Sequence, residues 1–155
     1  MVTLKNKKEL NDFIEKIPYY IDFLIKELNE KGISGDYIYF EKNIDEVQKF
    51  FRQNFFSYSE EKQDIIRLGF WAFFNKLLMD NLGGELIITP KNVYGSGTPM
   101  LINYGNLYDK KGKKKWNGIP VDSWLNTILL DKFLGTLQST VTYIINKYSN
   151  GNIKE

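Results

Sequence analysis

Four carboxylates flank the part of the sequence that is typical of β-strands, and they could perform acid–base or metal chemistry. They are Asp80, Glu85, Asp109 and Asp122. Carboxylates act as general acids and bases, or bind divalent cations, when several of them converge on one cleft. A carboxylate-based enzyme that uses these residues is therefore one hypothesis for the function.

Most other catalytic chemistry is excluded by the composition. The 155 residues include no histidine and no cysteine. A Ser-His-Asp triad, a Cys-His dyad, a zinc ribbon and a disulfide cannot form without them. The sequence Gly95-Ser96-Gly97 also lacks the third glycine, or the Gly-Lys-Ser/Thr, of a phosphate-binding loop. We expect no cofactor, no metal site and no enzymatic activity.

A second chemical feature is the cluster of lysines in the stretch YDKKGKKKWNG, residues 108–118. Residues 81–155 carry a net charge of +4, whereas residues 1–80 carry −2, and this cluster supplies the excess. Lysines bind phosphate as point charges, and aromatic rings beside them can stack on bases. The same rings are typical anchors of protein interfaces, and lysines also protect a hairpin from unwanted strand pairing. All three interpretations stay open.

We expect the partner-binding surface to combine this cluster with aromatic residues from the same half of the chain. The predicted partner-binding residues are Tyr94, Tyr104, Tyr108, Lys110, Lys111, Lys113, Lys114, Lys115 and Trp116. Aromatic side chains supply buried contact area at an interface, and lysines at its rim attract an acidic partner.

Helices are predicted at the start of the chain. Apolar residues recur every three or four positions from Leu10 to Leu28, which predicts helix over about residues 5–31. Pro18 lies inside this pattern, so we expect a kink there or the start of a second helix. Gly32 follows the last turn, as is typical of a helix end.

The next segment is ambiguous at its start. The stretch DYIYF, residues 36–40, suits either a strand or a short helical turn. Asn43 precedes Glu46 by three residues, which is the spacing of a capping box. We therefore expect a helix from this point to about residue 54.

A central, buried helix is predicted next. Ser57 is the expected N-cap, and apolar residues then cover most of the helix circumference between residues 60 and 82. Gly69 within this helix permits another element to approach closely. The pair Gly83-Gly84 is the expected C-cap, with a left-handed backbone.

The pattern then changes to strands and back to helix. Strands are predicted at about residues 85–90 and 98–105, followed by a hairpin that turns near residue 112. Apolar residues from Val121 onward predict one long helix to about residue 150, with Asp122 or Ser123 as its cap. Segregated helices and strands indicate an α+β fold: N-terminal helices, a buried central helix, a small antiparallel sheet of three to four strands and a long C-terminal helix.

The domain organisation is predicted from length and composition. With 43% hydrophobic residues, we expect residues 1–150 to form a single globular domain and residues 151–155 to form a loose tail. No signal peptide or membrane-spanning run is recognisable, so the expected location is the cytoplasm and no membrane partner is expected. The sequence makes no prediction of oligomeric state.

The segment LGFWAFFNKLLMDNLGGEL resembles a pattern of small bacterial domains of unknown function. In those domains a Leu-Gly-x-aromatic helix ends in Gly-Gly and leads directly into a strand. The matching residues here are Leu68, Gly69, Trp71, Gly83, Gly84 and Leu86. The resemblance covers about residues 60–130, and many such domains resemble immunity proteins, which bind and block a cognate toxin. It implies no catalytic residues.

These observations together predict a non-enzymatic protein-binding domain, and the resemblance implies an immunity protein that neutralises a bacterial toxin. The alternatives are a nucleic-acid-associated protein that uses residues 110–115, and the carboxylate-based enzyme. The expected partner is a protein, with nucleic acid as the alternative.

Overall fold

The computed structural model describes residues 1–106, 118–133 and 135–149, and these residues form seven α-helices and three strands. The helices are α1 (Lys7–Glu15), α2 (Ile17–Glu30), α3 (Tyr37–Lys42), α4 (Ile44–Asn54), α5 (Glu60–Leu82), α6 (Asp122–Leu129) and α7 (Leu137–Tyr148). The strands are β1 (Glu85–Ile88), β2 (Pro99–Ile102) and β3 (Ile119–Pro120), and single 3-10 turns lie at Phe55–Ser57 (η1) and Tyr104–Asn106 (η2). The predicted α+β class is confirmed.

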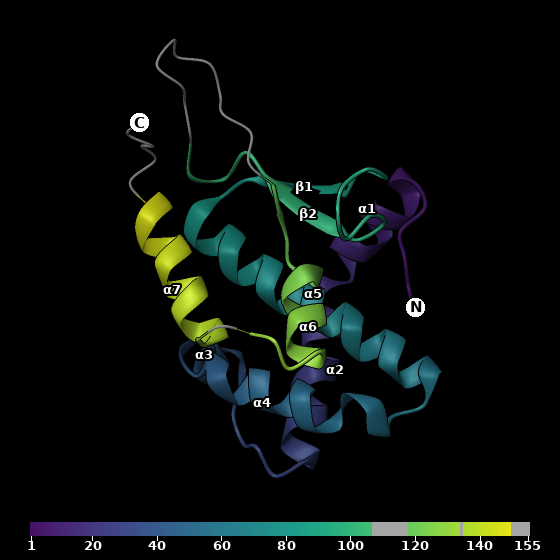
Figure 1. Ribbon diagram of the computed structural model, residues 1–155, viewed down its shortest axis with the longest axis vertical. Coiled ribbons are helices and arrows are strands. Elements are labelled where there is room, and N and C mark those ends of the chain that lie inside the picture. The colour runs from purple at the N-terminus through teal and green to yellow at the C-terminus, as the bar shows by residue number, and fades with distance from the viewer. Residues whose placement is uncertain (107–117, 134, 150–155) are drawn as a thin grey trace.

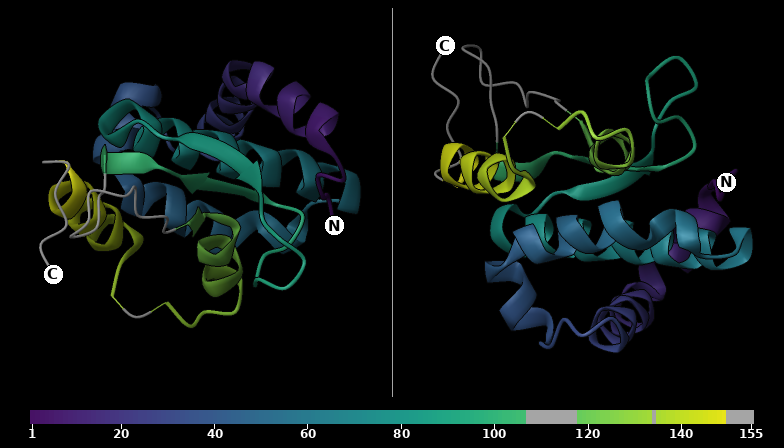
Figure 2. Two further views of the ribbon diagram at one scale, coloured as in Figure 1. Left: turned by 90° about the horizontal axis from the view of Figure 1, so that it is seen from above. Right: turned by 60° about the horizontal axis from the view of Figure 1, so that its bottom comes forward.

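Helix α5 passes through the middle of the molecule (Figure 1). In Figure 2 it lies between a layer that holds the sheet, α6 and α7 and a layer that holds α2. Its 23 residues span about 35 Å. Apolar side chains surround it, and Phe70, Trp71 and Phe74 have no exposed surface. The prediction of a buried central helix is confirmed, because such a helix needs covering on every side.

The start of α5 differs from the prediction. Ser57 was the predicted N-cap, but it lies in the 3-10 turn η1, and the N-cap is Ser59. The Ser59 hydroxyl accepts a hydrogen bond from the Lys62 backbone N–H at 3.2 Å. The helix begins two residues later than predicted because Phe55 is buried in the 3-10 turn and Tyr58 is extended.

The break at the first proline is confirmed. Helix α1 ends at Glu15, and Pro18 lies in the first turn of α2, where its missing N–H costs no helical hydrogen bond. Gly32, beyond the end of α2, has a φ of 84°, the left-handed conformation expected of a helix end.

The ambiguous stretch at residues 36–40 is helical. Asp36 caps α3, and its carboxylate accepts a hydrogen bond from the Tyr39 N–H at 2.9 Å. The capping box predicted at Asn43 does not form, since the Asn43 side chain makes no cap bond to α4. Its amide instead donates to the Tyr39 carbonyl at 2.8 Å and so satisfies the end of the preceding helix.

The strands form one antiparallel sheet in the order β1-β2-β3. Glu85 lies opposite Ile102 and Ile88 opposite Pro99, while Leu101 lies opposite Ile119. The sheet packs against α5 through β2, whose four residues are all buried. β1 is therefore an edge strand.

The C-terminal helical segment is present, but as two helices instead of one long helix. Helix α6 ends at Leu129, and Asp131 and Gly135 have φ values of 54° and 76°, which a continuous helix cannot contain. Thr136 then begins α7 with a capping box that uses the Ser139 hydroxyl. Apolar residues keep a helical spacing on both sides of the break, because α6 and α7 both pack their apolar sides against the core.

None of the helices in the described part of the chain combines the length and the apolar character that a bilayer crossing needs.

Close packing of α2 on α5 depends on Gly69. A Cβ atom at this position would lie 3.0 Å from the Leu24 Cβ and 3.2 Å from the Tyr20 carbonyl oxygen. We expect Gly69→Ala to lower the free energy of unfolding by about 1–3 kcal/mol, because the two helices must move apart. This loss exceeds the helix-propensity gain of about 1 kcal/mol. Urea unfolding measures the difference, and a raised midpoint would contradict the packing argument.

Candidate functional site

The carboxylates predicted as an acid–base or metal site do not converge. Asp80 pairs with Lys76 at 2.7 Å, and Glu85 accepts a hydrogen bond from Asn103 at 3.0 Å. Asp122 pairs with Arg67, which lies thirteen residues, or about 20 Å, before Asp80 on α5. The fourth carboxylate, Asp109, lies outside the described residues. Within the described residues no group of three potential metal ligands exists.

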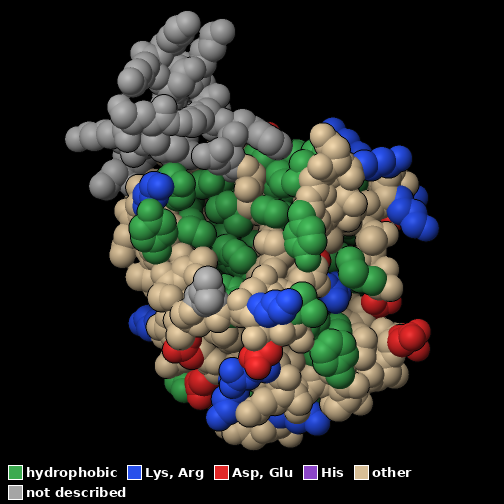
Figure 3. Space-filling model, in the orientation of Figure 1, with side chains coloured by type: hydrophobic (Ala, Val, Ile, Leu, Met, Phe, Trp, Pro, Cys, Tyr) green, Lys and Arg blue, Asp and Glu red, His purple; other side chains and the backbone are tan. Residues whose placement is uncertain are grey.

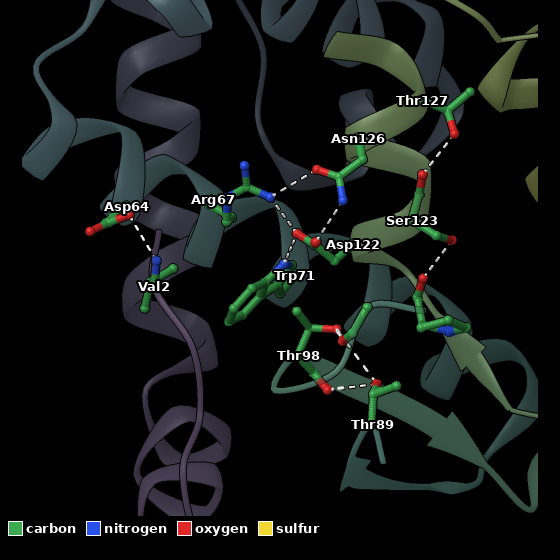
Figure 4. Close-up of polar contacts among 12 residues, drawn as sticks. Val2, Asp64, Arg67, Trp71, Thr89, Thr98, Asp122, Ser123, Asn126 and Thr127 are labelled. Atoms are coloured by element: carbon green, nitrogen blue, oxygen red, sulfur yellow. Dashed lines mark hydrogen bonds and ion pairs between the residues drawn. The ribbon is translucent and has the colours of Figure 1, made fainter. Parts of the chain in front are cut away.

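Asp122 is the centre of a buried polar cluster (Figure 4). One of its carboxylate oxygens lies 2.6 Å from the Arg67 guanidinium and accepts a hydrogen bond from the Trp71 indole N–H at 2.8 Å. The other oxygen accepts a hydrogen bond from the Asn126 amide at 3.3 Å. The Asn126 side-chain oxygen in turn accepts from Arg67 at 3.4 Å.

The cluster joins α6 to α5, and its carboxylate is closed to solvent. The Asp122 side chain has no exposed surface, and the Arg67 side chain is 8% exposed. Asp122 or Ser123 was the predicted cap, but the N-cap position of α6 is Val121 and no side chain makes a cap bond there. Asp122 is the first residue of the helix. Its carboxylate turns inward instead because the two donors on α5 need an acceptor. We interpret it as a structural group.

Loss of the Asp122 carboxylate tests this interpretation. We expect Asp122→Ala to lower the free energy of unfolding by about 3–5 kcal/mol, because it leaves a buried guanidinium without its charged partner. Thermal unfolding, followed by circular dichroism of the helices, measures the change.

The control is the double variant Arg67→Met/Asp122→Leu, which replaces the ion pair with apolar side chains. We expect it to recover most of the lost stability. If Asp122→Ala alone were as stable as the wild type, the ion pair would not hold α6 in place.

The predicted tyrosines lie at opposite ends of β2. Tyr94 is in the loop of residues 89–98 and is 67% exposed, so it is available to a partner. Tyr104 follows the other end of the strand and is only 3% exposed. Its ring packs edge-to-face on Tyr148 of α7, with the ring centroids 5.2 Å apart. Tyr104 is therefore buried between β2 and α7, and its predicted role in partner binding stays a prediction.

The remaining predicted partner-binding residues lie outside the described part of the chain. They are Tyr108, Lys110, Lys111, Lys113, Lys114, Lys115 and Trp116. Their role stays a prediction.

A groove runs along the outer edge of β1. It consists of two cavities, of about 470 and 400 Å³, that both reach Ile88. One wall comes from the N-terminal segment and α1, and the other comes from β1 and the loop that follows it. Both views in Figure 2 place α1 on the β1 side of the sheet.

The groove is apolar at its centre and basic along its length. Leu10 and Leu86 line the first cavity, together with Lys7. Lys5 and Lys91 line the second cavity. In Figure 3, Lys and Arg side chains gather at the upper right, where the loop of residues 89–98 lies in Figure 1. The described residues contain no carboxylate within ion-pairing distance of these three lysines.

Sequence reasoning did not find this groove. The strand itself was predicted, but its place at the edge of the sheet depends on the order of strand pairing. Lys5 and Lys7 lie more than 80 residues from Lys91 in the sequence. No local pattern could have indicated that the three share one surface.

Two partly enclosed tyrosines have raised pKa values. Burial, and then the Glu27 carboxylate, raises the pKa of Tyr58 to about 12. The Tyr58 hydroxyl donates to Glu27 at 3.3 Å, and Lys62 pairs with the other Glu27 oxygen at 2.7 Å. Burial, and then Tyr148, raises the pKa of Tyr104 to about 12.

These shifts predict how stability depends on alkaline pH. The folded state holds the two phenols in their neutral form, whereas in the unfolded chain they ionise near pH 10. Their contribution is fully present below pH 10 and is lost as the pH rises to about 12. Urea unfolding at a series of pH values measures the loss, and Tyr58→Phe should make it shallower. Absorbance at 295 nm that showed all tyrosines of the native protein ionising near pH 10 would contradict the prediction.

Comparison with protein-family models, with curated proteins and with solved structures finds no match to this chain.

Proposed function

We propose that this chain is a non-enzymatic protein-binding domain, an immunity protein that neutralises a cognate bacterial toxin in the cytoplasm by direct contact. The observation that carries the proposal is the groove along β1, with an exposed tyrosine in the loop beside it. Supporting it, Asp122 is committed to a buried ion pair, and Asp80 and Glu85 make separate contacts away from it.

The groove has the composition of a protein-binding surface. Its centre is apolar, its rim is charged, and Tyr94 and Val93 in the adjoining loop are 67% and 37% exposed. Tyrosine is among the residues that contribute most to interface affinity. A partner that covers the groove and the loop would bury both.

The charge of the groove indicates the kind of toxin surface that it would contact. Lys5, Lys7 and Lys91 give it a positive potential, which attracts an acidic surface and speeds association with it. Inhibitors of nucleases are usually acidic, because they cover a basic active site. The groove therefore favours a toxin whose contact surface is acidic.

Affinity capture followed by a growth assay tests the proposal. Tagged protein is used to capture partners from a lysate of its own host, with and without nuclease and with a high-salt wash. We expect a protein in stoichiometric amount that survives both treatments. Expressed alone, the captured protein should arrest bacterial growth. Co-expression of the proposed immunity protein should restore growth.

Two results would overturn the proposal. One is capture that disappears on nuclease treatment, which would instead support the alternative of nucleic-acid binding through residues 110–115. The other is a captured protein that does not arrest growth.

A further inference from the structure

The backbone groups on the outer edge of β1 are available to a new strand. The Thr89 N–H donates to the Thr98 carbonyl at 2.8 Å, so Thr89 faces β2. Alternate residues of an antiparallel strand face the same neighbour. Ile87 therefore also faces β2, whereas Leu86 and Ile88 direct their N–H and C=O groups to the open edge. In the described chain no backbone hydrogen bond reaches these groups from another segment.

The sequence of β1 itself carries none of the features that usually block strand pairing. Natural edge strands commonly carry a lysine, a proline or a bulge that blocks addition of another strand. β1 has the sequence ELII, and Pro90 comes only after it ends. Helix α1 lies beside the strand but leaves the cavity of about 470 Å³ between them. An edge with free backbone groups beside an open groove is an arrangement that accepts an added strand.

The side chains around the edge define the chemistry of the segment that fits. Lys5, Lys7 and Lys91 are exposed and unpaired within the described residues, and they lie along both cavities. Glu85, the one acidic residue among the described residues that line the groove, is already engaged by Asn103. Between the lysines the lining is apolar. A strand that alternates acidic and apolar side chains would match both properties, since successive side chains point to opposite faces.

We propose that an extended, acidic segment of the protein partner adds to the sheet along β1. Its backbone pairs with Leu86 and Ile88, its apolar side chains enter the groove, and its carboxylates contact Lys5, Lys7 and Lys91. This inference rests on the proposed function, because it names the mode by which the partner is bound.

A synthetic peptide tests the edge without the partner. The probe is an eight-residue peptide of alternating Val and Glu, and its matched control has Lys in place of Glu. Titration is followed by the backbone amide signals in NMR spectra. We expect the Val-Glu peptide to shift the Leu86 and Ile88 amides and to slow their hydrogen exchange, and the Val-Lys peptide to leave both unchanged. Equal effects of the two peptides, or none from either, would overturn the inference.

Variants of the chain separate the two parts of the inference. Ile88→Pro removes one outward N–H that no described group accepts, so we expect it to fold and to lose peptide binding. The triple variant Lys5→Gln/Lys7→Gln/Lys91→Gln should bind the Val-Glu peptide about tenfold more weakly than the wild type does. The charge-matched control changes three exposed lysines away from the groove, Lys26, Lys42 and Lys132, to Gln, and should bind as the wild type does. If the two triple variants bind the Val-Glu peptide equally well, the prediction that the added segment is acidic is wrong.

The same variants distinguish failure of this inference from failure of the proposed function. If the wild type captures no toxic partner, the proposed function fails, whatever the peptide does. The other outcome is that the wild type captures a toxic partner, and that the Ile88→Pro variant and the Lys5→Gln/Lys7→Gln/Lys91→Gln variant capture it equally well. In that case the partner binds elsewhere, and only the strand-addition mode is overturned.

Discussion

The need to cover α5 on every side is the constraint on which the rest of the structure depends. Large apolar side chains surround this helix, and leaving any side of it in water would forfeit roughly 25 cal/mol for each Å² of apolar surface. Helix α2 covers one side, through the close approach that Gly69 permits. The sheet, α6 and α7 cover the others. The remaining elements pack around this shell, as α4 does against α6 and α7.

The same requirement explains why polar groups are buried beside α5. Arg67 lies among apolar neighbours on the helix, with the Phe55 ring 5.4 Å from the guanidinium carbon. A guanidinium in this position needs an acceptor, and α6 supplies one at its first residue, Asp122. The ion pair therefore specifies how α6 lies on α5.

The sheet is small because it serves as one more cover for α5. Its size has a functional consequence. With three short strands and α1 beside the first of them, β1 keeps an open edge, and the groove follows that edge. The exposed Tyr94 and the groove lysines surround the part of the sheet that is least covered. The proposed binding surface needs no catalytic residue type, which is consistent with a sequence that lacks histidine and cysteine.

The sequence by itself determined the local features whose causes lie within a few residues. The buried central helix, the break at Pro18, the left-handed Gly83-Gly84 turn and the strand after it depend on apolar periodicity and on backbone restrictions, which are local properties. Only the tertiary structure decided the rest. The division of the C-terminal helix at Asp131, the burial of Tyr104 under α7 and the inward turn of Asp122 all depend on partners far away in the sequence. The groove depends on strand order and on lysines from two distant segments, and so no local pattern encodes it.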